Sequence, residues 1–511
     1  MDLNIFKIPR NVLATLRATL EDKGYITIRT HAESEWRSEF LFLEGNEDVA
    51  IWLRMYEEFF EGRQLPTRKN HSAVYIFFTD YACYAITHGA SHFHVRSLCD
   101  YDFGTNLAKR IANEKDVRHT AAKRYQGSRK KENRTYRVNT RLDVDSGESI
   151  DMIQSAIIDT KRDIFGPTGR FGASAILSPP VGVSGIAGLL SAIEAELDNP
   201  ELFTLPRDME VKDKADIELF DRLLIEEITA KDGLTDFTAN SMDLCGVDFN
   251  FMFGSPGRFS LKHPRRRSSA DFLDRQGHDL TIDDLRLYIE TEGLTGSDIL
   301  KIKVTRYNDT DWDPDLTLKE SLDYIADSHR VVLTEGKWRY FNQDYLSFLD
   351  EYVRGIQVEE TEDNFKIISE TETKFNASER VRQAGYEMAD KDFSIAAIKS
   401  GTPVEAWDLK KDGTVYAVKF GTAQKLGYVC DQARALLKLV QNRATVKEIP
   451  QFDRYCLWLG YMTKGLPRNI ADTNSIILKQ KINEWAKLCR EVGPTPVIKL
   501  SRHTGRQLRL F

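Results

Sequence analysis

The sequence has few cysteines and no long apolar runs. Its six cysteines are spread over 511 residues, and no two form a CxxC pair. Disulfide frameworks and zinc ribbons need closely spaced cysteines, so the sequence favours neither. No stretch approaches the roughly 18 apolar residues of a membrane helix, and the first residues lack the apolar core of a signal peptide. We therefore expect a cytoplasmic protein with free thiols and no membrane partner.

Length and composition indicate a multidomain α+β protein. The 511 residues exceed the size at which single cores stop growing, and 41% hydrophobic with 29% charged residues suit packed cores under a solvated surface. Composition shifts predict four parts. These are a mixed α/β domain over 1–148, a central α/β domain over 149–357, an acidic linker or hairpin over 358–373, and a C-terminal domain over 374–511.

The C-terminal part has the clearest local pattern. Periodicity predicts a helix over Ala377–Met388, strands over Phe393–Ile398, Val404–Leu409 and Val415–Phe420, a helix over Thr422–Asn442, and a late strand at Val497–Leu500. The resulting order is α-β-β-β-α-β. Asp412-Gly413 predicts a two-residue hairpin turn, in which Lys411 pairs with Thr414 and the numbers of paired residues sum to about 825.

Positive charge is concentrated in residues 109–141. Twelve basic and three acidic residues give this segment a net charge of +9, although the whole chain carries −7. Such an excess is typical of a surface that binds phosphates, and it lacks enough nearby acids to be neutralised locally. The alternative is a solvated loop that pairs with an acidic face of the same chain. The nucleic-acid-binding candidates are Lys123, Arg124, Arg129, Lys130, Lys131, Arg134 and Arg137, with Arg265, Arg266 and Arg267 from a second basic cluster.

Several short motifs together resemble a bacterial family of "sporadically distributed" proteins. They are Ser72-Ala73-Val74, Tyr84 to Gly89, Asp102-Phe103-Gly104, Leu333 to Tyr340, Glu405-x-x-Asp408-Leu409, and Val418-Lys419 followed by a helix with Gln432. The resemblance spans most of the chain and implies a mobile or antiviral-defence gene setting, without an established chemistry. Two positions depart from the family pattern, because Ala417 and Tyr428 stand where histidines are frequent.

The C-terminal order also resembles the core of restriction-endonuclease-like nucleases. In those enzymes carboxylates on neighbouring strands hold Mg²⁺, and a lysine stabilises the charge that grows on the phosphate. Asp408 and Glu405 are the metal and catalytic candidates here, and Lys419 is the catalytic lysine. An ordinary hairpin with solvated charges is the alternative, because Ala417 occupies the usual acid position before Lys419.

Three functions remain open on the sequence alone. The first is a DNA-binding restriction or defence nuclease that hydrolyses phosphodiesters with magnesium. The second is a non-catalytic DNA- or RNA-binding scaffold, acting as a homo-oligomer or with a defence-system partner. The third is a different enzyme whose central Gly-rich stretch, Gly166–Gly185, holds a nucleotide; that stretch lacks the GxxxxGK[ST] phosphate loop.

Overall fold

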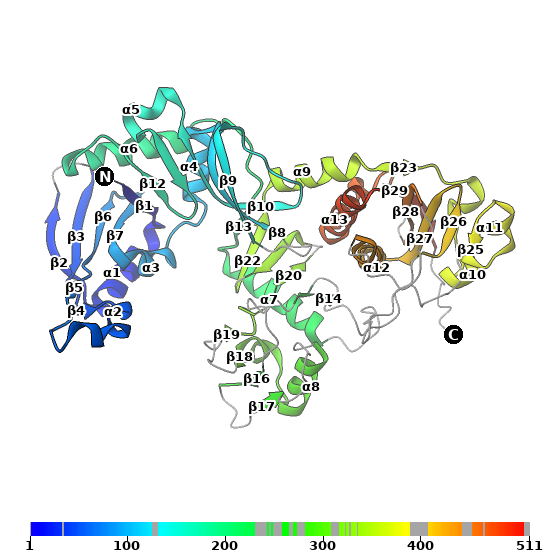
Figure 1. Ribbon diagram of the computed structural model, residues 1–511, viewed down its shortest axis with the longest axis horizontal. Coiled ribbons are helices and arrows are strands. Elements are labelled where there is room, and N and C mark those ends of the chain that lie inside the picture. Colours follow the sequence, from blue (N-terminus) through cyan, green and yellow to red (C-terminus); the bar gives the residue numbers. More distant parts are fainter. Residues whose placement is uncertain are drawn as a thin grey trace. The chain divides into compact units, whose positions relative to one another are not determined.

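The protein is an α+β chain with several sheets, as expected, and a computed structural model divides it into two compact units (Figure 1). Unit 1 comprises the described residues up to Arg207, and unit 2 those from Asp208 onward. The described residues are 2–32, 35–124, 131–229, 243–244, 247–248, 258–264, 269–272, 282–307, 316–321, 323–326, 329–334, 336–388, 407–441, 452–462 and 465–504.

Unit 1 is built on one ten-stranded antiparallel sheet. Its β-branched and aromatic runs alternate between two faces, which is the pattern of strands buried on at least one side. The strand order is β2 (Ile26–His31), β3 (Arg37–Leu43), β6 (Ser72–Phe78), β7 (Cys83–His88), β1 (Leu3–Lys7), β12 (Ala175–Leu177), β11 (Thr168–Phe171), β10 (Glu148–Ile157), β8 (Ala112–Arg124) and β9 (Lys131–Thr140).

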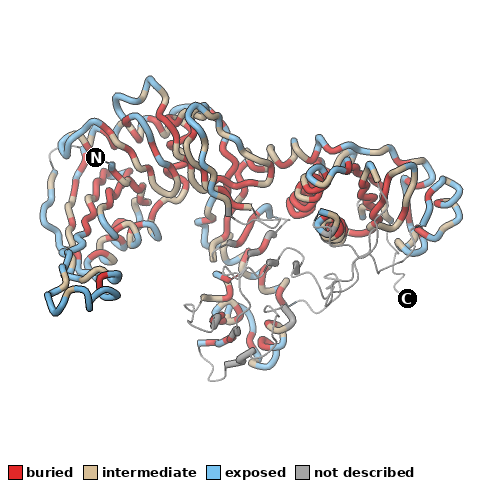
Figure 2. The backbone as a smooth tube through the Cα atoms, viewed as in Figure 1, coloured by how far each residue is buried: buried red, intermediate tan, exposed pale blue. Residues whose placement is uncertain are grey.

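Helices cover the two faces of this sheet unequally. On one face, Phe6 of β1 packs with apolar residues of α1 (Leu13–Asp22) and α3 (His92–Arg96). On the other face, Ile5 packs with α4 (Phe103–Ile111) and α6 (Ile186–Leu197). The second core extends as far as β8 and β10, whereas the first contains no residue of β8 to β12. The buried stretches of the tube in Figure 2 follow these cores.

An insertion connects the neighbouring strands β3 and β6. Residues 44–71 form a small hairpin, β4 (Glu47–Val49) with β5 (Thr67–Lys69), and between them lie α2 (Ile51–Met55) and the 3-10 turn η2 (Glu57–Phe60).

The first part of unit 2 contains two small sheets. A six-stranded sheet has the order β13-β22-β21-β20-β15-β14, and a four-stranded sheet has the order β17-β16-β18-β19. Apolar residues of α7 (Lys214–Thr229) and α8 (Ile282–Glu292) pack with both sheets in one core. The strands are β13 (Asp208–Glu210), β14 (Asp243–Leu244), β15 (Val247–Asp248), β16 (Arg258–Lys262), β17 (Ser269–Phe272), β18 (Lys303–Tyr307), β19 (Leu316–Thr317), β20 (Asp323–Ala326), β21 (Val331–Thr334) and β22 (Lys337–Phe341).

The second part of unit 2 is a mixed sheet with both faces covered. One face packs on α9 (Gln343–Arg354), α12 (Ala423–Gln441) and α13 (Ile476–Val492), and the other on the segment that contains α10 (Glu372–Asn376) and α11 (Glu379–Gln383). The parallel strands β27, β28 and β29 form the centre, and β23 and β24 both pair with β29. The strands are β23 (Gln357–Glu359), β24 (Ile367–Ile368), β25 (Glu387–Met388), β26 (Leu409–Lys411), β27 (Thr414–Gly421), β28 (Arg454–Tyr461) and β29 (Thr495–His503).

The predicted hairpin is confirmed. Lys411 pairs with Thr414 and Leu409 with Tyr416, so paired numbers sum to 825. Asp412 and Gly413 both have positive φ, 47° and 70°, as a type I′ turn requires. The expected strand Phe393–Ile398 lies outside the described residues. The prediction of a helix over Ala377–Met388 is wrong, because the chain there forms the short α11 and then β25.

The compact units differ from the predicted domain boundaries. The expected boundary at residue 148 falls at the start of β10, which pairs with β8 inside the ten-stranded sheet, so unit 1 continues to Arg207. The expected linker 358–373 contributes β23 and β24 to the C-terminal sheet. Pairing with β29 orders a segment whose composition alone indicated a linker.

Candidate functional site

The basic segment 109–141 folds into the edge of the ten-stranded sheet. Its first half ends α4 and continues as β8, and its second half is β9, the outermost strand. Alternation of polar with small or β-branched residues fits strands that expose one face. The two strands pair from Lys123↔Lys131 to Val117↔Thr140, with an irregularity between Val117 and His119.

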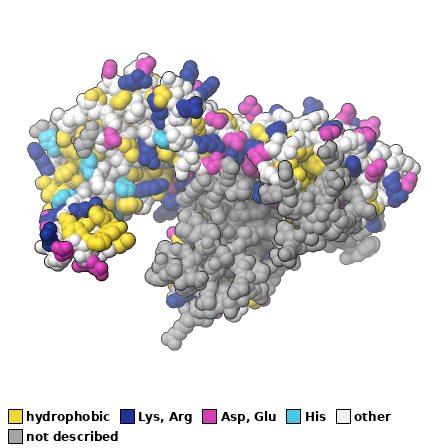
Figure 3. Space-filling model, in the orientation of Figure 1, with side chains coloured by type: hydrophobic (Ala, Val, Ile, Leu, Met, Phe, Trp, Pro, Cys, Tyr) yellow, Lys and Arg dark blue, Asp and Glu magenta, His cyan; other side chains and the backbone are white. Residues whose placement is uncertain are grey.

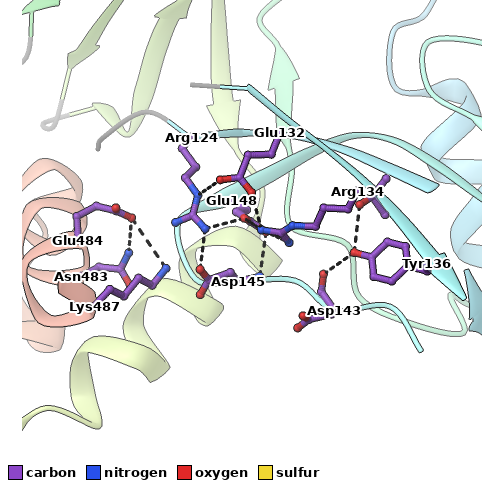
Figure 4. Close-up of polar contacts among 11 residues, drawn as sticks. Arg124, Glu132, Arg134, Tyr136, Asp143, Asp145, Glu148, Asn483, Glu484 and Lys487 are labelled. Atoms are coloured by element: carbon purple, nitrogen blue, oxygen red, sulfur yellow. Dashed lines mark hydrogen bonds and ion pairs between the residues drawn. The ribbon is translucent and has the colours of Figure 1, made fainter. Parts of the chain in front are cut away.

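A buried carboxylate lies between two of the candidate arginines. The Glu148 side chain is fully buried, and it accepts hydrogen bonds from Arg124 at 2.8 Å and from Arg134 at 2.9 Å (Figure 4). Asp145 lies 2.7 Å from Arg124 and Glu132 lies 2.9 Å from Arg134. Burial alone would lower the pKa of Arg134, but its hydrogen bonds and charge interaction with Glu148 raise that pKa above the usual value. We call these five residues the Glu148 cluster.

Other basic residues of the segment are also paired. Lys123 is buried and lies 3.1 Å from Asp151, and Lys109 lies 3.3 Å from Glu201. These acids, like Asp145 and Glu148, lie outside residues 109–141. The expectation that the segment lacks acids to neutralise it is therefore corrected: the fold brings acids from later in the chain to these basic side chains.

The remaining nucleic-acid candidates divide into two groups. Arg137 is exposed on β9. Lys131 lies at the start of the same strand and pairs with Lys123 of β8. Arg129, Lys130, Arg265, Arg266 and Arg267 lie outside the described residues.

A row of polar side chains crosses the sheet of unit 1 beyond its helices. Directly opposed residues of an antiparallel sheet share a face, and the register aligns one residue from each of six strands. Asn4 and Ile176 are half-buried, Arg170 is exposed, Gln154 and His119 are half-buried, and Thr135 is exposed. Arg137 lies two residues beyond Thr135 on β9 and is exposed. We call Arg170, Gln154, His119, Thr135 and Arg137 the open row. Sequence reasoning proposed only Arg137 and missed the other four, because only the register brings them into one line.

In unit 2, two carboxylates bind the backbone of β27 where β26 ends. Antiparallel pairing of β26 stops at Leu409↔Tyr416, so the later N–H groups on that side of β27 have no β26 partner. Asp408 accepts the Val418 N–H at 2.8 Å, and Glu372 of α10 accepts the Phe420 N–H at 2.8 Å. The acids thus replace a strand along the last residues of β27.

The predicted catalytic lysine belongs to the same edge. Lys419 Nζ lies 3.0 Å from Glu372 and 5.6 Å from the centre of the Tyr428 ring. Asp408 also accepts a hydrogen bond from Asn376 at 3.1 Å. Glu372 was missed by sequence reasoning, since a lone acid at the start of a short helix carries no recognisable signal. We call Asp408, Glu372, Lys419 and Asn376 the β27 edge cluster; Glu405 lies outside the described residues.

A buried lysine occupies the centre of the C-terminal sheet. The Lys499 side chain is only 1% exposed, and its Nζ lies 2.9 Å from Glu359 and 2.6 Å from Glu362. Tyr386 accepts a hydrogen bond from Lys499 at 2.7 Å and donates one to Glu362 at 2.9 Å. Burial and the negative charge of Glu362 raise the pKa of Tyr386 well above its usual value. We call these four residues the Lys499 cluster.

No group of three or more His, Cys, Asp or Glu side chains among the described residues is arranged to hold a metal ion. No helix in the described ranges has the length and apolar character needed to cross a membrane.

These features define a two-unit α+β protein with an open polar sheet face in one unit and a carboxylate-lysine cluster in the other. The model of a family described as a family of unknown function, DUF6119, matches residues 3–449, and the chain belongs to this family. No curated protein and no solved structure matches the chain.

Proposed function

We propose that unit 1 binds single-stranded nucleic acid across the open row. The observation that carries this proposal is the alignment of cationic and hydrogen-bonding side chains on one helix-free part of a sheet face. Arg170 and Arg137 stand at the two ends of the open row, and both are exposed.

The chemistry of the open row suits a single strand. Exposed arginines attract phosphates, while Gln154, Thr135 and His119 offer donors and acceptors to sugar or base edges. A broad sheet face cannot enter a duplex groove, whereas single strands lie across such faces with their bases accessible. The paired arginines of the Glu148 cluster hold the strands in register beneath this surface, and we assign them no phosphate contact. The resemblance to sporadically distributed bacterial proteins is the support for a role in antiviral defence.

Charge reversal at both ends of the open row tests the proposal. In Arg137→Glu with Arg170→Glu, affinity for a fluorescent single-stranded DNA or RNA oligonucleotide should fall steeply at low salt. The slope of log affinity against log salt should decrease by roughly 1.4, because two phosphate contacts to a single strand are lost. The control reverses Arg63 and Arg68, which are exposed on the insertion. Equal losses in both variants would show a general charge effect and contradict the open row as the site.

The β27 edge cluster favours a second candidate, magnesium-dependent phosphodiester cleavage. Asp408, Glu372 and Lys419 meet at the carboxyl end of a parallel strand, where open α/β sheets commonly bind ligands. Two carboxylates suit Mg²⁺, which is often held by one or two carboxylates together with water and substrate phosphates. The Oδ1 atom of Asn376 is buried without a hydrogen-bond partner, although its side chain touches Asp408. An oxygen ligand set of this kind fits the metal.

In this candidate site, magnesium when bound supplies Lewis-acid stabilisation of the phosphate oxygens. Asp408 and Glu372 would hold the ion, and Lys419 would stabilise the charge that develops on the phosphate. All four carboxylate oxygens already accept one hydrogen bond each, so the same residues also support the strand. A restriction-endonuclease-like core remains part of this proposal.

Single substitutions can separate a role of the β27 edge cluster in cleavage from its role in supporting strand β27. Asp408→Asn retains an oxygen for the Val418 N–H but removes the charge that binds metal. Cleavage of single- and double-stranded DNA with Mg²⁺ should fall at least 100-fold in Asp408→Asn and in Lys419→Ala, while oligonucleotide binding by unit 1 persists. Titration calorimetry with Mg²⁺ should show weaker binding in Asp408→Asn. A wild-type chain that neither binds Mg²⁺ nor cleaves would leave the non-catalytic binding protein as the function.

A further inference from the structure

The insertion between β3 and β6 is longer than their connection requires. These strands are antiparallel neighbours with Leu43 opposite Ser72, and a two-residue turn would join them. Residues 44–71 instead extend as the β4–β5 hairpin carrying α2 and η2.

The outer side of this insertion is apolar. The side chains of Ile51 and Met55 on α2 and of Phe59 on η2 are 86%, 78% and 78% exposed. Trp52 and Tyr56 widen the stripe, and the Tyr56 and Phe59 rings stack 5.7 Å apart. Contiguous apolar surface of this kind is rare on monomeric proteins unless it marks an interaction site. The yellow patch around α2 in Figure 3 is this surface, and we call the five residues the apolar arm face.

The rim of the apolar arm face carries both signs of charge. Arg54 lies 3.4 Å from Asp48, with both side chains 65% exposed, and Lys69 lies 2.9 Å from Glu44. Glu57 and Glu58 directly precede Phe59 and are exposed. A membrane-binding stripe is typically bordered by an excess of lysine and arginine. The charges of this mixed rim are instead self-complementary, because Arg54 of one copy can face Glu57 and Glu58 of another.

We infer that the apolar arm face joins two copies of this chain in a two-fold symmetric dimer. Antiparallel pairing centred on Met55 places Met55 beside Met55 of the second copy. It brings Ile51 near Phe59, and it brings Arg54 near Glu57 and Glu58. A two-fold interface requires this self-complementarity, because the same patch serves both sides.

The size of the face sets the expected strength. Three aromatic and two aliphatic side chains present on the order of 500 Å² per copy, about the largest patch found on ordinary monomers. Two such faces bury about 1,000 Å² in all, near the lower limit for a specific interface. We therefore expect a reversible dimer with a dissociation constant on the order of micromolar.

Sedimentation velocity of the full chain over a range of concentrations tests the dimer. Trp52→Ser with Phe59→Ser should raise the dissociation constant at least 100-fold, because central aromatic residues dominate interface energies. Phe93→Ser is the matched control: Phe93 is 71% exposed and lies on α3, outside the insertion. A wild-type chain that stays monomeric at about 100 µM, or a dimer that survives the double substitution, would overturn the inference.

Crosslinking tests the symmetry. In Met55→Cys, mild oxidation should give a disulfide-linked dimer, because the two new thiols meet on the axis. Five native cysteines are buried within the described residues, and the unsubstituted chain reports any background from Cys245. Phe93→Cys should not crosslink above that background. Equal crosslinking of both variants would overturn the arrangement, as would binding of the monomer to phosphatidylcholine vesicles through Trp52.

Discussion

The Glu148 cluster of unit 1 and the Lys499 cluster of unit 2 have opposite arrangements of charge. In the first, one buried acid lies between two arginines; in the second, one buried base lies between two glutamates. The acids and bases of the Glu148 cluster all fall within residues 124–148. In the Lys499 cluster, Glu359 and Glu362 come from a segment about 140 positions earlier.

This difference determines whether a buried charge cluster leaves a recognisable pattern in the sequence. A cluster of near neighbours appears in the sequence as a charge run, and the run over 109–141 was visible, although its structural purpose was not. A cluster that joins distant strands leaves two unrelated traces, an acidic stretch near residue 360 and an isolated lysine at 499. Buried charges need their partners in either case, because removal of one partner leaves the other uncompensated.

The largest expected effect is at Glu148. Glu148→Gln leaves Arg124 and Arg134 beside a neutral group in a buried site, and unit 1 should lose about 3–5 kcal/mol of stability. Urea unfolding followed by hydrogen exchange in β8 to β10 measures this loss. Glu114→Gln is the control, because its partner Arg141 is 73% exposed and such surface pairs contribute at most about 1 kcal/mol. Similar losses in both variants would contradict the importance of burial.

An intermediate effect is expected at Lys499, together with a reversed pH dependence. Burial alone would raise the pKa of Glu362, but hydrogen bonds from Lys499 and Tyr386, with the charge of Lys499, lower it. A lowered folded pKa contributes stability above the unfolded pKa, about 4.3, and this contribution is lost as pH falls through the folded value.

Lys499→Met should remove that contribution and leave two crowded carboxylates. The variant should unfold more easily at pH 7, and acidification from pH 7 to pH 5 should now stabilise it, because the pKa of Glu362 rises. Thermal unfolding of both proteins across this range provides the measurement. A parallel pH dependence in wild type and variant would show that Lys499 does not control the glutamates.

The smallest effect is expected at Asp408, whose partner is a backbone group. Asp408→Ala leaves the Val418 N–H without its acceptor and should cost about 1–3 kcal/mol, whereas Asp408→Asn keeps an oxygen there and should cost less. Chemical denaturation of the two variants gives the comparison. Equal losses of stability in the two variants would mean that the charge of Asp408, rather than its hydrogen bond with the Val418 N–H, stabilises the edge of β27.

Two local signals in the sequence predicted their elements closely, although the helix expected over Ala377–Met388 was wrong. The Asp412-Gly413 turn correctly predicted the pairing register of β26 with β27. The helix predicted from Thr422 to Asn442 differs from α12 by one residue at each end. Both depend on contacts within a few positions.

Pairing between strands that are distant in the chain could not be predicted from the sequence. The strands β23 and β24 have three and two residues, too few for a pattern, and they form because β29 lies beside them. The open row likewise depends on the register of six strands. At the β27 edge cluster, Asp408 and Lys419 were proposed from the sequence, but Glu372 enters only because α10 packs against the end of β27.

The place of β29 within its sheet has a consequence for synthesis of the protein. This strand lies between β28 and β23, yet it follows both in the chain. A ribosome delivers β23 and β24 long before residues 495–503, so on the nascent chain these two segments have no strand to join. Exposed strand edges attract chaperones and misassembly. Ribosome-bound chains that stop before Thr495 should therefore keep residues 357–368 open to protease, and release of the longer chain should close that segment at a single late step.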